Sequence, residues 1–92
     1  MSYSIFTTRK FDKAFKKCLK RGLKEEKYKA VYQQLLDSGT VSAEHRPHKL
    51  SGDYTGCWEC HIQGDWVLVW QQNDEELTLL LLDTGSHSDI FG

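Results

Sequence analysis

Residues 57–82 read CWECHIQGDWVLVWQQNDEELTLLLL and contain three short apolar runs separated by turn residues. Residues 57–63 alternate between apolar and polar side chains, which is typical of a strand with one buried face. Residues 66–71 are largely apolar and predict a central strand, and residues 76–82 predict a third strand. This segment therefore predicts an antiparallel meander of three strands.

The turns of this meander are short. Gly64-Asp65 can form a two-residue hairpin loop, because glycine tolerates the backbone angles that such loops require, and Asn73-Asp74 marks the next turn. With this loop Gln63 opposes Trp66, and we expect Trp66 on the same face as His61. Asp65 would lie at the turn, within reach of both.

Two amphipathic helices precede the meander. Residues 3–7 predict a short strand, after which Thr8 can cap a helix that ends near Gly22. Apolar residues at helical spacing predict a second helix over residues 24–37. We therefore expect an α+β fold with the order β-α-α-β-β-β, in which both helices pack on one face of a small antiparallel sheet. The length fits one domain over residues 1–92.

Charge is divided unevenly along the chain. All 12 Lys and Arg residues occur at or before Lys49, with five acids among them, whereas residues 50–92 contain eight acids and no Lys or Arg. The first predicted helix has a basic stripe at helical spacing, which suggests contact with a polyanion. The stripe consists of Lys10, Lys13, Lys17, Lys20 and Lys24.

Nothing in the sequence resembles a targeting signal, and the longest apolar run, Leu79–Leu82, is too short to span a bilayer. We therefore expect a cytoplasmic protein without membrane contact. The three cysteines, Cys18, Cys57 and Cys60, are expected to be reduced thiols in that compartment.

Cys57-Trp58-Glu59-Cys60-His61 matches the C-x-x-C-H pattern of c-type haem attachment. An alternating strand would place Cys57 and Cys60 on opposite faces, which disfavours haem. Zinc held by these cysteines, His61 and His48 is a second alternative, but structural zinc favours cysteine pairs on tight knuckles. We expect neither cofactor.

Three histidines and an aspartate offer a different chemistry. His48, His61 and His87 occur with Asp65, and histidine can act near neutral pH as general base, general acid or phosphate ligand. These are the groups that cleavage of RNA through the ribose 2′-hydroxyl requires. Any one of these histidines alone is more often a structural residue, so the joint pattern carries the hypothesis.

The motifs around these residues resemble the YafQ-type branch of the RelE toxin superfamily. The resemblance rests on His48-Lys49-Leu50-Ser51-Gly52, on His61-Ile62 with Asp65-Trp66, and on Thr84-Gly85-Ser86-His87 with Ile90-Phe91-Gly92. It implies a toxin of a type II toxin-antitoxin module, an endoribonuclease that cleaves mRNA in the ribosomal A site. A small antitoxin would inhibit it, and operator DNA would be bound only through the toxin-antitoxin complex.

The resemblance also implies roles for single residues. His48, His61, Asp65 and His87 would be catalytic, with His87 as general acid, either His48 or Asp65 as general base, and no metal or cofactor. RNA would be contacted by Lys49, Trp66, Phe91, Lys10, Lys13, Lys17 and Lys20.

Asp83 departs from the family pattern, which usually has an arginine just before Thr-Gly-Ser-His. An arginine there would stabilise charge on the scissile phosphate, and an aspartate cannot. Lys49 and a protonated His61 are candidates to replace it. The alternative is a catalytically weak relative that acts mainly as an antitoxin-binding and autorepression partner.

Overall fold

The structure, a computed structural model, describes residues 2–92, so Met1 of the expected domain lies outside it. Its helices and strands follow the predicted order, with additional short elements. The elements are β1 (Ser4–Thr7), α1 (Arg9–Lys20), α2 (Glu25–Ser38), η1 (Ala43–His45), β2 (His48–Lys49), η2 (Gly52–Tyr54), β3 (Trp58–Gln63), β4 (Trp66–Asn73), β5 (Thr78–Gly85) and α3 (His87–Phe91).

The strands form one five-stranded sheet in the order β1-β5-β4-β3-β2. The predicted meander is confirmed, because β3, β4 and β5 pair antiparallel. The expectation of a purely antiparallel sheet is wrong, since β1 pairs parallel with β5. The sequence also failed to predict β2, which extends the sheet beyond β3.

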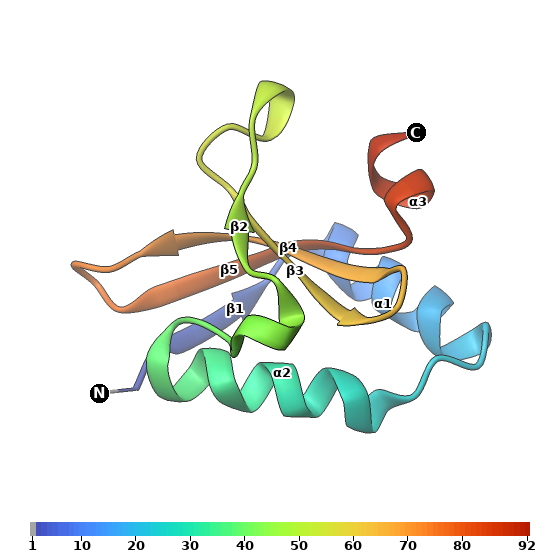
Figure 1. The fold of residues 1–92 in the computed structure, drawn as a ribbon, viewed down its shortest axis with the longest axis horizontal. Coiled ribbons are helices and arrows are strands. Elements are labelled where there is room, and N and C mark those ends of the chain that lie inside the picture. Colours follow the sequence, from blue (N-terminus) through green and yellow to red (C-terminus); the bar gives the residue numbers. More distant parts are fainter. Residues whose placement is uncertain (1) are drawn as a thin grey trace.

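Helices α1 and α2 cover one face of the sheet, as Figure 1 shows. Phe11 and Cys18 of α1 and Val31 and Leu35 of α2 are buried in one apolar cluster with side chains of β3, β4 and β5. Burial of such side chains is the main stabilising contribution to a domain of this size. The opposite face of the sheet is free of these two helices and is available for a site.

The helix boundaries have local causes that the sequence predicted. The Thr8 hydroxyl accepts a hydrogen bond from the Phe11 amide and caps α1. Gly39 ends α2 in the left-handed conformation with φ 73°, and a Cβ there would meet the Tyr3 ring at 2.5 Å. Glycine is required at this position for both reasons.

Trp66 does not lie on the face expected for it. A β-bulge between His61 and Gln63 shifts the pairing by one residue, so that His61 opposes Val67 while Gln63 still opposes Trp66. The Trp66 ring therefore points to the helix-covered face, where it is 3% exposed and donates a hydrogen bond to the Thr84 hydroxyl at 2.8 Å. His61 precedes the bulge and keeps its place on the other face, beside His87.

The C-terminal segment is more ordered than the sequence suggested. β5 continues to Gly85, and residues 87–91 form α3 at the end of the sheet (Figure 1). The Ser86 hydroxyl accepts from the Asp89 amide, and the Asp89 carboxylate accepts from the Ser86 amide, which together make a capping box. No helix of residues 2–92 is long and apolar enough to cross a membrane.

Candidate active site

Five polar side chains meet on the sheet face opposite α1 and α2, and we call them the histidine cluster. They come from four parts of the fold: β2, β3, the β3–β4 turn and the first residue of α3. The cluster consists of His48, Glu59, His61, Asp65 and His87. The structure thus brings together all four residues expected to be catalytic and adds Glu59.

Glu59 is the centre of this cluster. Its Oε1 atom lies 3.2 Å from His48 Nε2 and 3.3 Å from His87 Nε2. The side chain is only 2% exposed, and its other oxygen, Oε2, is buried without a hydrogen-bond partner. A buried carboxylate that is only half satisfied is costly, and such groups are typical of functional sites.

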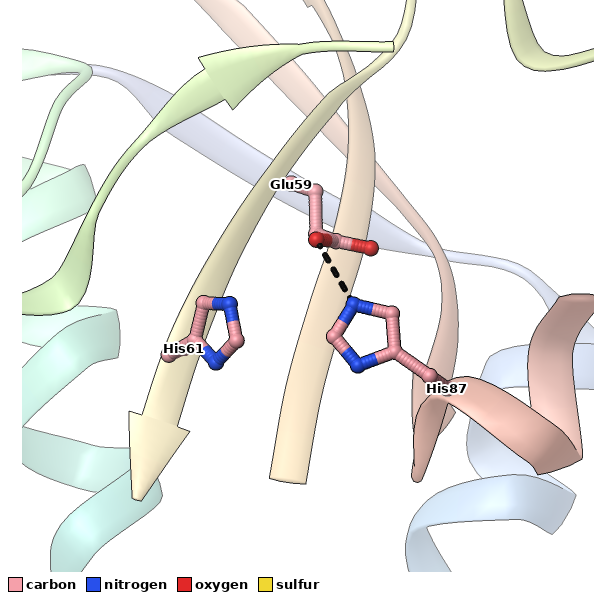
Figure 2. A group of neighbouring side chains, drawn as sticks. All are labelled: Glu59, His61 and His87. Carbon is pink, nitrogen blue, oxygen red and sulfur yellow. Dashed lines mark hydrogen bonds and ion pairs between the residues drawn. The ribbon is translucent and has the colours of Figure 1, made fainter. Parts of the chain in front are cut away.

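His87 is held between two carboxylates. Its Nδ1 atom contacts Asp65 Oδ1 at 3.0 Å. Its Nε2 atom contacts Glu59 Oε1, as Figure 2 shows. The hydrogen bond to Asp65, together with the charge of Glu59, raises the pKa of His87 above its ordinary value. The same hydrogen bond lowers the pKa of Asp65. His87 is therefore favoured in its protonated form, with both ring nitrogens acting as donors.

His48 is fixed by its backbone neighbours. Its Nδ1 atom lies 2.8 Å from the Arg46 carbonyl oxygen, and a carbonyl can only accept. Nδ1 therefore carries a proton, and Nε2 is the nitrogen that faces Glu59. The pairing of His48 with Glu59 across β2 and β3 sets this distance.

His61 lies beside His87, with ring centroids 5.4 Å apart (Figure 2). Its Nδ1 atom lies 3.3 Å from Arg46 Nη2 and 3.1 Å from the Gly64 carbonyl oxygen. The adjacent His45 ring contacts the His61 carbonyl at 2.7 Å and joins η1 to β3.

Sequence reasoning missed Glu59 and Arg46 as members of the site. Glu59 had a signal, because it lies two residues before His61 and therefore on the same face of a strand. Arg46 had none, since its approach to His61 depends on the irregular chain between α2 and β2.

Three of these residues could hold a metal ion. Glu59, His61 and His87 each offer one ligand atom, and the three atoms lie within 4.8 Å of one another (Figure 2). This is the one such group among residues 2–92, and it contains no cysteine. All three cysteines are free and buried, and burial raises the pKa of Cys60 to about 12, which keeps that thiol protonated.

The expected RNA-binding residues have different surroundings. Phe91 is 42% exposed and lies next to His87, and Lys13 and Lys17 line an open cavity of about 330 Å³ along α1. Lys49 lies with its ammonium 5.7 Å from the centre of the Trp58 ring, away from the cluster. Trp66 is buried under the helices and has no surface to offer an RNA.

Asp83 is engaged outside the histidine cluster. One of its oxygens forms an ion pair with Lys10 at 3.3 Å, and the other accepts from the Thr84 amide at 2.9 Å. Its side chain is only 9% exposed. Lys10 and Asp83 therefore neutralise each other at the start of α1, and neither lies free at the cluster.

These features define a small α+β protein with an acid-base site of three histidines and two carboxylates. The chain belongs to the YafQ family, described as bacterial toxins of type II toxin-antitoxin systems, whose sequence profile matches residues 3–92. The mRNA interferase toxin YafQ of Escherichia coli K12 is 28% identical over 83 residues, which are 89% of this chain and 88% of that protein.

Solved structures agree with this assignment. The toxin in the Escherichia coli DinJ-YafQ toxin-antitoxin complex is 26% identical, with a TM-score of 0.88 and full coverage of both chains. A copper-bound mutant toxin from Helicobacter pylori is 31% identical, with a TM-score of 0.86 over 99% of this chain and 100% of that chain. The predicted fold and family are confirmed.

Proposed function

We propose that this toxin is an endoribonuclease that cleaves mRNA in the ribosomal A site by acid-base catalysis at the histidine cluster. The observation that carries the proposal is the contact of His48 Nε2 and His87 Nε2 with one oxygen of Glu59. Because they share this oxygen, the two Nε2 atoms lie close enough together to act on one phosphodiester. In-line attack of a ribose 2′-oxygen on the adjacent phosphate needs a base on the side of the attacking oxygen and an acid on the side of the leaving oxygen. The mRNA interferase activity of the Escherichia coli relative supports this substrate class.

His87 is the general acid in this proposal. Asp65 holds its Nδ1 and raises its pKa, which favours the protonated ring whose Nε2 can give its proton to the leaving 5′-oxygen. In this proposal Asp65 is a positioning residue and not the general base, because its carboxylate is engaged by His87. The arrangement follows the general logic in which a carboxylate orients a histidine and stabilises its charged form.

His48 is the general base. The Arg46 carbonyl accepts from its Nδ1–H, so the neutral ring has its lone pair on Nε2. Nε2 takes the proton of the 2′-hydroxyl when this hydroxyl replaces its contact with Glu59. Glu59 stabilises the imidazolium that forms. After cleavage His48 carries one proton more and His87 one fewer, and Glu59 Oε1, which contacts both Nε2 atoms, is a direct path for the proton to return.

The products are a 2′,3′-cyclic phosphate and a 5′-hydroxyl, and the residues supply acid and base without a metal ion. The partners follow from the same proposal. The ribosome and its mRNA would be met by the lysine stripe of α1 and by Phe91, and a small antitoxin would inhibit the site. The DinJ complex of the relative supports an antitoxin partner.

The experiment that tests this function is cleavage of a defined mRNA on programmed ribosomes by EDTA-treated protein. We expect wild-type protein to cleave in the A site, and His87→Ala to reduce the rate by about 10² to 10⁴. Ser88→Ala, a change at the exposed neighbouring residue, is the control and should retain activity. Absence of cleavage by folded wild-type protein would contradict the proposal, and loss of cleavage only after EDTA would contradict its metal independence.

A further inference from the structure

The histidine cluster contains two carboxylates, Glu59 and Asp65, and a phosphodiester brings further negative charge to it. Transfer at phosphate needs a positive group at the phosphate oxygens. Within residues 2–92, the contact between Arg46 and His61 is the one hydrogen bond or ion pair that joins a Lys or Arg side chain to the cluster. The charge that the reaction requires is therefore available from Arg46.

Arg46 has an unusual backbone conformation. Its φ is 48° and its ψ is 57°, in the left-handed region that residues other than glycine seldom occupy. Only Arg46 and Leu77 among the non-glycine residues described have positive φ. The conformation lets the Arg46 carbonyl hold His48 Nδ1 while its side chain reaches His61. Strain of this kind at a polar cluster is typical of functional residues.

The Arg46 guanidinium and the Gly64 carbonyl compete for the same atom, His61 Nδ1. A guanidinium can only donate and the Gly64 carbonyl can only accept, yet both lie within hydrogen-bond distance of His61 Nδ1. A neutral ring satisfies one of them at a time. The guanidinium is therefore held loosely, and His61 keeps a hydrogen bond when the guanidinium leaves.

The guanidinium also has room to move. Arg46 is exposed and lines a cavity of about 370 Å³ together with Lys27, His45, His61 and Gln63. A phosphate entering from solvent can meet it without displacing a buried group. The planar fork of arginine donates two parallel hydrogen bonds to phosphate, which is stronger and more directional than a lysine contact.

We propose that the guanidinium of Arg46 binds the scissile phosphate. When it leaves His61 for the phosphate, the ring proton of His61 moves from one nitrogen to the other. This inference rests on the proposed function, because it adds a substrate-binding residue to the same site. Without substrate, Arg46 donates to His61 Nδ1 and the ring proton lies on Nε2. With phosphate bound, Nδ1 carries the proton and donates to the Gly64 carbonyl. The proton exchanges through water, so no other group changes charge.

The first test uses Arg46→Gly, because glycine favours the left-handed backbone and keeps the fold while the guanidinium is lost. We expect single-turnover cleavage on programmed ribosomes to fall by about 10² to 10³. Guanidinium ion added at low millimolar concentration should restore part of the rate, and Arg46→Lys should retain only part of it. Arg9→Gln removes a positive charge from an exposed position outside the cluster and should leave the rate unchanged.

Wild-type cleavage together with an undiminished rate of Arg46→Gly would overturn this inference and leave the proposed function standing. Failure of the wild-type protein to cleave would overturn both. The tautomer change is measured separately by ¹⁵N NMR of the His61 ring with a 2′-deoxy dinucleoside phosphate, which presents a phosphate but cannot be cleaved. In wild-type protein the ¹⁵N shift typical of a protonated nitrogen should move from Nε2 to Nδ1 when the dinucleoside phosphate is added, and in Arg46→Gly it should not move. Unchanged ¹⁵N shifts of His61 in the wild type would overturn the proposed change of tautomer.

Discussion

Among the single residues, His87 carries most of the proposed chemistry because it alone contacts both carboxylates of the cluster. Asp65 contributes through this ring. It is largely exposed, and its hydrogen bond is the main cause of the raised pKa of His87. Asp65 in the β3–β4 turn thus favours the protonated form of His87, which lies 22 positions further along the chain.

Asp65→Ala should shift the pH dependence of cleavage. A general acid must be protonated, so the rate falls as pH rises through the pKa of His87. Loss of the Asp65 hydrogen bond lowers that pKa, and the alkaline limb of the rate profile should move to lower pH. Single-turnover rates across pH measure this shift, and Asp53→Ala, a change at an exposed residue of η2, should leave the limb in place. An unmoved limb in Asp65→Ala would contradict the role of Asp65.

At the scale of elements, α3 positions His87 and is itself anchored to α1. Arg21, just after α1, pairs with the Asp89 carboxylate, which also takes part in the capping box of α3. Arg21 and the Ser86 groups hold the pKa of Asp89 well below its usual range. The helix is only five residues long, so it depends on such contacts for its placement.

Arg21→Gln should reduce the rate several-fold while leaving the Tm almost unchanged, because the ion pair is exposed and contributes little to global stability. The rate falls because α3, without its anchor, holds the His87 ring less precisely. Thermal unfolding and single-turnover rates on the same samples separate the two effects, with Arg9→Gln as the matched change in charge. A large drop in Tm, or a wild-type rate, would show that the anchor does not act in this way.

The elements also show where sequence reasoning succeeds and where it stops. Regular periodicity predicted α1, α2 and the meander, because burial of one face imposes a fixed spacing on the residues. A bulge changes the facing of every residue beyond it, and nothing in His61-Ile62-Gln63 signals one, so Trp66 was assigned to the wrong face. The contact of Arg46 with His61 arises from tertiary packing, which no local pattern encodes. Helix α3 did have a local signal, the capping-box spacing of Ser86 and Asp89, which the sequence reasoning did not use.

In the whole molecule, the uneven distribution of charge along the sequence places many of the lysines on a different face from the acid-base site. Four lysines of the stripe, Lys10, Lys13, Lys17 and Lys20, lie in α1, whereas Lys24, expected on the same helix, is the N-cap of α2. The histidine cluster lies on the sheet face that α1 and α2 leave free. Lys10 is neutralised by Asp83, so Lys13 and Lys17 in the α1 cavity are the members best placed to meet an external polyanion. Binding through such lysines depends on salt, because each contact with a phosphate releases counterions.

The double variant Lys13→Gln/Lys17→Gln should bind ribosomes more weakly and lower the slope of log affinity against log salt by about one to two. The control, Lys16→Gln/Lys29→Gln, removes the same charge from exposed positions outside the stripe. Sedimentation binding over a salt series measures both. Equal slopes in the two variants would mean that total charge, and not the stripe, governs binding.

The central claim is that the histidine cluster activates the ribose 2′-hydroxyl of the RNA itself. The most direct measurement compares two mRNAs on programmed ribosomes that differ only in a 2′-deoxy group at the scissile nucleotide, with analysis of the product ends. Wild-type protein should cleave only the all-ribose mRNA and leave a 2′,3′-cyclic phosphate and a 5′-hydroxyl. Cleavage of the 2′-deoxy mRNA at a similar rate, or a 5′-phosphate on the product, would contradict the account.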